Sequence, residues 1–83
     1  MDAMYEEEMI DLITFCIQNP NSDQVETKKN RISQIGSELF SDGGVDAMEN
    51  MFFAIKNRIN EEIGKDPNSF RTLWNGVTTE WNY

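Results

Sequence analysis

The chain has 83 residues, of which 15 are acidic and seven are basic, and its formal net charge is −8. This length predicts one small domain, and 39% hydrophobic with 27% charged residues is typical of a globular protein. We do not expect direct binding to nucleic acid or to a membrane, because so acidic a chain repels phosphates and no apolar run approaches the roughly 18 residues of a span.

The first predicted helix covers residues 2–18. Apolar side chains recur along it every three or four positions, which is the spacing of one buried helix face. Pro20 ends this helix, because the residue before a proline is disfavoured in the helical region. The buried face consists of Tyr5, Met9, Leu12, Ile13 and Cys16. Since the only cysteine lies on that face, we interpret it as a core residue in a reducing compartment and predict a cytoplasmic protein.

The second predicted helix covers residues 22–40. Ser22 is its expected N-cap, with Asp23 favourably placed at the positive end of the helix dipole. A glycine, Gly36, lies on the apolar face and leaves room for a neighbouring helix to approach closely. The remaining members of that face are Val25, Ile32, Ile35 and Leu39.

Two further helices follow, over residues 45–63 and 67–81. The acidic segment SDGG (41–44) is expected to reverse the chain before the first of them, and Gly64 to cap its C-terminus. Asp66 as N-cap with Pro67 at the first helical position marks the start of the second. Short connections make neighbouring helices antiparallel, so the sequence predicts an all-α single domain, a compact four-helix bundle.

The segment GGVDAMENM (43–51) resembles the modification site of acyl carrier proteins, which are small acidic helical proteins whose serine carries phosphopantetheine. Gly44 stands where that serine would be, and Ser41 lies three residues too early. Asp42 and Asp46 would also repel a phosphate at this helix start. We therefore predict no carrier group here and interpret the segment as a turn.

No other cofactor, metal or catalytic motif is predicted. The window NPNSDQVETKKN (19–30) has Gln24 where a calcium loop needs glycine and Asn30 where it needs a bidentate glutamate. Histidine, the commonest general base, does not occur in the chain. The sequence therefore predicts a protein that is not an enzyme.

Some apolar and acidic side chains are not needed by the four predicted core faces. Met4 and Phe15 lie on the outer side of the first helix, Phe53 lies off the face of the third, and two aromatic residues stand among the last three. Either they close the ends of a core in which the first helix lies between two neighbours, or they form a partner surface. We predict partner binding by Met4, Glu7, Asp11, Phe15, Phe53, Trp81 and Tyr83.

The function that these patterns favour is that of a non-catalytic protein-interaction module. It would recognise a helix or a basic surface on a protein partner, using apolar contacts and acidic steering, with a homodimer left open. The first alternative is an acidic inhibitor or decoy, of the DNA-mimic or immunity type, that blocks a basic nucleic-acid-binding cleft. A small-molecule carrier or binder is the third hypothesis. The decoy would lose affinity steeply with salt, whereas an apolar groove would not.

Overall fold

The computed structural model describes residues 3–83, and within this range it contains three helical elements and no strand. They are α1 (Ala3–Gln18), α2 (Val25–Ile63) and the 3-10 helix η1 (Pro67–Trp74). The all-α prediction is confirmed, while the four-helix bundle is not. The predicted start of the first helix at residue 2 lies outside the described residues.

α2 spans both of the predicted middle helices in 39 residues. It begins at Val25 rather than at residue 22, because the Ser22 hydroxyl accepts a hydrogen bond from the Gln24 N–H (3.1 Å) and caps a turn that precedes the helix. Only Gly44 inside it has non-helical torsion angles, with φ 73° and ψ −167°. Glycine reaches this region at little cost because it has no Cβ.

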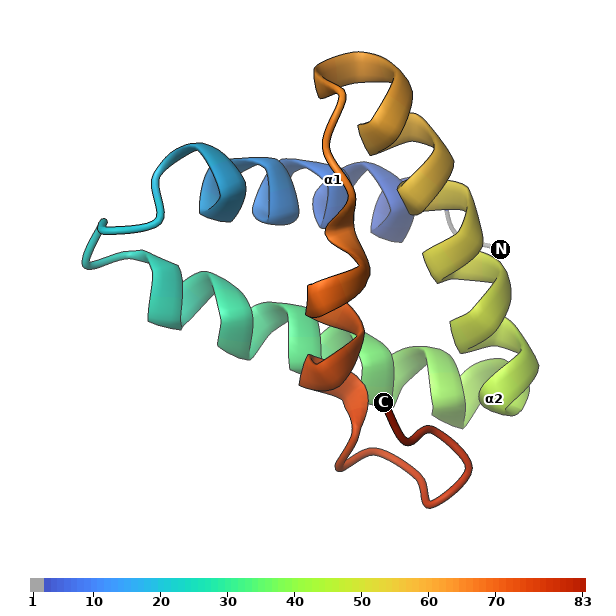
Figure 1. Cartoon of the computed structure of the whole chain (residues 1–83). Coiled ribbons are helices and arrows are strands. Elements are labelled where there is room, and N and C mark those ends of the chain that lie inside the picture. The colour runs from blue at the N-terminus through green and yellow to red at the C-terminus, as the bar shows by residue number, and fades with distance from the viewer. Residues whose placement is uncertain (1–2) are drawn as a thin grey trace.

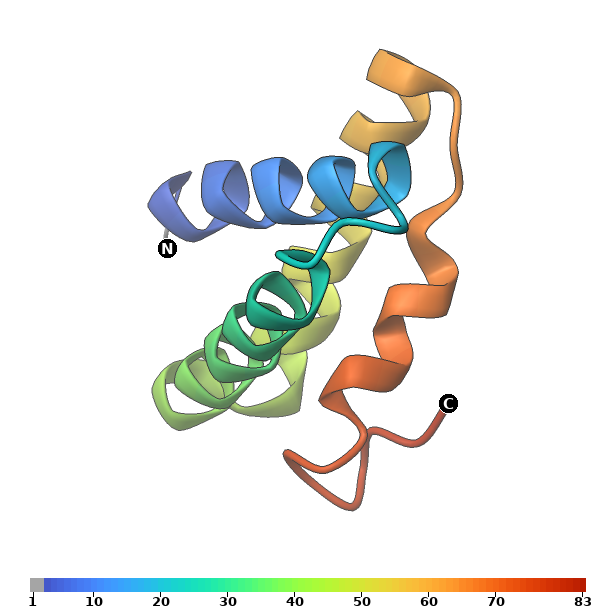
Figure 2. The ribbon, with the colours of Figure 1, turned by 90° about the vertical axis from the view of Figure 1, so that its left-hand side faces the viewer.

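The SDGG segment therefore breaks α2 into two helical halves, which correspond to the two predicted middle helices, but it does not reverse the chain. Figure 1 shows the first half of α2 (25–43) running beside α1 and the second half (45–63) leaving steeply from the bend. Figure 2 shows the second half crossing behind the first, with η1 on the other side of it. The predicted reversal is corrected to a sharp bend at one residue.

The C-terminus of α2 and the N-terminus of η1 have the predicted capping residues, whereas the predicted N-cap Ser22 does not cap α2. Gly64 has φ 67°, and its N–H donates to the carbonyl of Asn60 at 2.9 Å. The Asp66 carboxylate accepts from the Asn68 N–H at 3.0 Å, and Pro67 is the first residue of η1.

The last predicted helix is shorter and tighter than expected. η1 has 3-10 geometry and ends at Trp74, seven positions before the predicted end at residue 81. Gly76 weakens any continuation, and the Thr78 hydroxyl accepts a hydrogen bond from the Glu80 N–H at 3.3 Å in place of helical pairing. Residues 75–83 instead form turns that return the chain toward α2.

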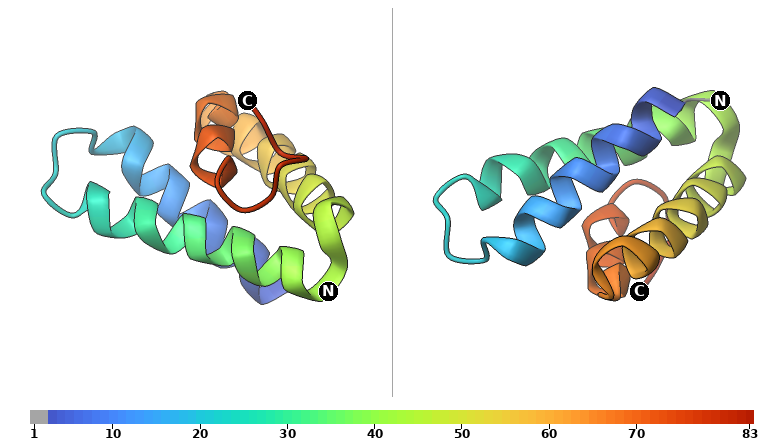
Figure 3. Two further views of the ribbon diagram at one scale, coloured as in Figure 1. Left: turned by 90° about the horizontal axis from the view of Figure 1, so that it is seen from below. Right: turned by 90° about the horizontal axis from the view of Figure 1, so that it is seen from above.

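The core lies between the three elements, and its large side chains come from all of them. Trp74 of η1 packs directly on Gly36, where an added Cβ would lie 2.5 Å from its Cδ1 atom, and its indole N–H donates to the carbonyl of Ile32 at 2.7 Å. The predicted close approach at Gly36 is therefore present. Figure 3 shows α1 and the first half of α2 side by side. The radius of gyration is 11.9 Å, which matches the roughly 12 Å expected of a compact chain of this length.

Candidate functional site

The outward face of α1 carries four of the residues predicted to bind a partner. At 100° per residue, Met4, Glu7, Asp11 and Phe15 fall within about 80° of the helix circumference, opposite the buried Met9. Met4 is 76% exposed, Asp11 is exposed, and Phe15 is half-buried. We call these four residues the α1 face.

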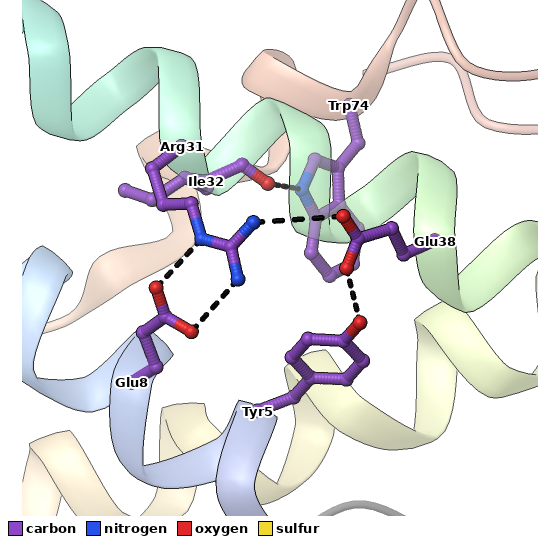
Figure 4. Close-up of polar contacts among 6 residues, drawn as sticks. All are labelled: Tyr5, Glu8, Arg31, Ile32, Glu38 and Trp74. Atoms are coloured by element: carbon purple, nitrogen blue, oxygen red, sulfur yellow. Dashed lines mark hydrogen bonds and ion pairs between the residues drawn. The ribbon is translucent and has the colours of Figure 1, made fainter.

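An arginine from each half of α2 holds one edge of the α1 face. Arg31, in the first half, forms a bidentate salt bridge with Glu8, with Nε–Oε2 and Nη2–Oε1 distances of 2.6 and 3.0 Å. Its other terminal nitrogen lies 3.5 Å from Glu38, whose carboxylate accepts a hydrogen bond from the Tyr5 hydroxyl (Figure 4). The hydrogen bond from Arg31 lowers the pKa of Glu8, and the same bond raises the pKa of Arg31.

Arg58, in the second half of α2, holds the opposite edge. Its guanidinium lies 2.7 Å from Glu7, 3.2 Å from Glu6 and 3.2 Å from Glu62 of its own helix. These hydrogen bonds, first of all the one to Glu7, raise the pKa of Arg58. α1 therefore lies between the two halves of α2, which the sequence analysis left open as one explanation of its surplus apolar residues.

An open groove of about 930 Å³ runs beside the α1 face, between α1 and the first half of α2. Its carboxylates are Glu8, Glu38 and Asp42, against one guanidinium, that of Arg31. The exposed Met4 forms part of its wall. The residues that line it are Met4, Tyr5, Glu8, Arg31, Gln34, Ser37, Glu38, Ser41 and Asp42.

One cation of the chain itself already lies on the α1 face. The Lys28 ammonium is 4.7 Å from the centre of the Phe15 ring, which is within the range of a cation–π contact. This contact and the nearby start of α2 leave Phe15 half-buried, so the ring offers a partner less area than its place in the sequence indicates.

Trp81 belongs to the core, which corrects its predicted place on a partner surface. Its side chain is 1% exposed, its ring centre lies 5.1 Å from that of Trp74 and 6.4 Å from that of Phe52, and its indole N–H donates to the Arg71 carbonyl at 2.8 Å. The reason is the turn after η1, which brings the C-terminal residues back over α2.

Phe53 and Tyr83 are two further exposed aromatic residues from the predicted partner surface. They are 64% and 56% exposed, respectively. The Tyr83 hydroxyl donates to Glu49 at 3.1 Å, and Phe53 follows Glu49 by one helical turn, so both lie near the same part of α2. Because Phe53 and Arg58 are five residues apart, their side chains point about 140° apart, and the two aromatic residues are not continuous with the α1 face.

Arg71 contacts three aromatic rings and a carboxylate, and no sequence pattern predicted this role. Its guanidinium carbon lies 4.6 Å from the Phe52 ring centre, 4.9 Å from that of Tyr83 and 5.5 Å from that of Trp81. Its Nη1 atom lies 3.5 Å from the Glu49 carboxylate. The only sequence feature that could have indicated these contacts is its position, as a single arginine between two groups of aromatic residues. The guanidinium joins η1, α2 and the C-terminal turns.

Among residues 3–83, no three side chains of the His, Cys, Asp and Glu types are grouped so that they could hold a metal ion. No helix in the same range has the length and apolarity to cross a membrane. Cys16 is buried, and desolvation raises the pKa of its thiol, which disfavours the reactive thiolate.

No protein-family model matches the chain, and no curated protein or solved structure is significantly similar to it. A functional proposal for this protein therefore rests on the properties of its surface.

Proposed function

We propose that the protein is a non-catalytic interaction module whose α1 face, together with the adjoining groove, recognises a basic helix or basic surface on a protein partner. The observation that carries this proposal is an exposed methionine, Met4, which shares its helix face with Asp11 and its groove with Asp42. Neither of these carboxylates forms an ion pair within residues 3–83.

The arrangement of charges supports a basic partner. All three arginines are bound by carboxylates of the same chain, which neutralises most of their field at the surface. Eight exposed acids have no such partner in the described residues, and a surface of this kind attracts lysine and arginine and guides their approach. These acids are Asp11, Asp23, Glu26, Asp42, Asp46, Glu61, Asp66 and Glu80.

The shape of the surface supports a helical partner. A groove between two antiparallel helices, here α1 and the first half of α2, accepts one face of an amphipathic helix, with apolar side chains as anchors and basic ones at the rim. Met4 stands at the rim of the groove, and methionine adapts to differently shaped apolar side chains. We propose the cytoplasm as the location of such a module, because a single buried cysteine without a disulfide partner is typical of a reducing compartment.

The decoy alternative receives less support. Its strongest sequence feature is the run Glu6, Glu7 and Glu8, and each of these carboxylates is bound by Arg58 or Arg31. They therefore do not stand free in a row that could replace the phosphates of a nucleic acid. An interaction module that attracts a basic partner requires only the acids that have no arginine partner.

Affinity capture from the native cell tests the proposal. The wild type is compared with Asp11→Lys/Asp42→Lys, which reverses one charge on the α1 face and one in its groove. The control is Asp46→Lys/Glu61→Lys, which makes the same change of net charge on the second half of α2. We expect wild type and control to retain the same partners and the first variant to lose them. Equal capture by all three would contradict the proposal.

Salt separates the module from the decoy in the same capture experiment. Between about 50 and 500 mM salt, we expect a moderate decrease in capture, because apolar contacts persist when charges are screened. A steep loss, with nucleic-acid enzymes as the captured proteins, would favour the decoy instead.

A further inference from the structure

Two adjacent glycines allow the bend in α2, each for a different reason. Gly44 has a φ of 73°, a conformation that residues with a side chain rarely adopt. Gly43 has no room for a side chain, because an added Cβ would lie 2.9 Å from the Cβ of Ala47. The bent chain therefore excludes a side chain at both positions.

A straight α2 would impose neither restriction. In a continuous helix every residue has a negative φ, and Cβ atoms four positions apart are separated by about 5–6 Å. Alanine is then the better helix former at both positions. Substituting both glycines should therefore penalise the bent form and favour the straight one.

A straight α2 does not fit inside one folded copy. Its 39 residues would extend for about 58 Å at 1.5 Å per residue, whereas the longest dimension of the molecule is 31 Å. The second half would leave α1, and the buried Met48, Phe52 and Ile55 would lose the surface that they pack on. A second copy of the chain offers that same surface.

We propose that Gly43 and Gly44 form a hinge that holds the protein as a closed monomer, and that its straightening gives a domain-swapped dimer. In this dimer the second half of α2 and η1 of each copy pack on α1 and the first half of α2 of the other. Arg58 then pairs with Glu6 and Glu7 across copies, so the contacts of the monomer are kept and only the hinge changes.

The experiment compares the wild type with Gly43→Ala/Gly44→Ala by size-exclusion chromatography with light scattering and by circular dichroism. The control is Gly64→Ala, whose φ of 67° and open surroundings give the same backbone strain at a helix end, away from the bend. We expect the doubly substituted protein to have twice the monomer's molar mass by light scattering and a stronger helical signal by circular dichroism. The wild type and the control should stay monomeric.

A distance measurement identifies the swap. Spin labels are placed at the exposed positions 11 and 57 in a Cys16→Ala background, and the labelled chain is refolded with an excess of unlabelled chain. We expect the distance found within the wild-type chain to be lost in the doubly substituted chain and replaced by a longer one.

Four results would overturn the hinge. They are a folded monomer, a dimer that keeps the wild-type intramolecular distance, a doubly substituted chain that loses helix, and a wild type that is already dimeric. None of these four results tests the α1 face, so the failure of the hinge proposal would leave the proposed function unchanged, and the reverse also holds.

Discussion

The contact between Gly36 and Trp74 shows how one residue positions an element. The indole fills the space above the glycine, and its N–H reaches the Ile32 carbonyl of the same helix. The sequence predicted the close approach, because a glycine on an apolar helix face has few other uses. It did not identify Trp74 as the contacting side chain, since that depends on where η1 lies.

Gly36→Ala should destabilise the protein by about 1–3 kcal/mol, although alanine is the better helix former, because its Cβ would overlap the Trp74 ring. Gly76→Ala is the matched control, since an added Cβ there meets no atom within 4 Å. Denaturant unfolding followed by tryptophan fluorescence measures both. Equal stability of the two variants would show that the indole does not occupy this space.

Other single residues illustrate where sequence reasoning ends. Asp66, Pro67 and Gly64 have their predicted capping roles, because these depend on local backbone geometry alone. The sequence predicts Trp81 on the surface, because residues at the end of a chain usually fray. Its burial requires the turns of residues 75–83, which no local pattern in the sequence specifies.

At the scale of elements, the helices were predictable and their joins were not. The apolar spacing located α1 and both halves of α2, since each buries one face. Whether SDGG separates two helices or bends one depends on the torsion angles of a single glycine. The arginine pairs that join α1 to α2 involve residues 23 to 52 positions apart, beyond the reach of any local pattern.

The pair between Arg31 and Glu8 makes the attachment of α1 dependent on pH. Because Arg31 lowers the pKa of Glu8 below its ordinary 4.5, the folded protein binds this proton less readily than the unfolded chain. The stability from the pair is therefore complete above pH 4.5 and is lost as the pH falls through the lowered pKa. Replacing Glu8 removes this contribution.

We expect Glu8→Gln to melt below the wild type near pH 7, and the difference to shrink as the pH falls below about 4.5. Glu26→Gln, whose carboxylate has no ion pair in the described residues, should stay close to the wild type throughout. Thermal melts over a pH series measure the three proteins. A difference for Glu8→Gln that grows on acidification would show that the pair does not act as described.

At the scale of the whole molecule, composition predicted the sign of the surface but not its distribution. A net charge of −8 indicated an acidic protein. The fold then pairs six glutamates with three arginines. It leaves Asp11 on the same helix face as the exposed Met4, and Asp42 in the groove that Met4 lines. It also separates the α1 face from the pair of Phe53 and Tyr83, which the sequence analysis had grouped together.

Site-specific photo-crosslinking in the native cell tests the role of the α1 face most directly. A photoreactive amino acid replaces Met4 in one protein and, as the control, the exposed Asn57 of the second half of α2 in another. We predict crosslinks to a basic protein partner from position 4, their loss when Asp11→Lys/Asp42→Lys is added, and none from position 57. Equal crosslinking from both positions, or crosslinks from position 57 alone, would contradict the account.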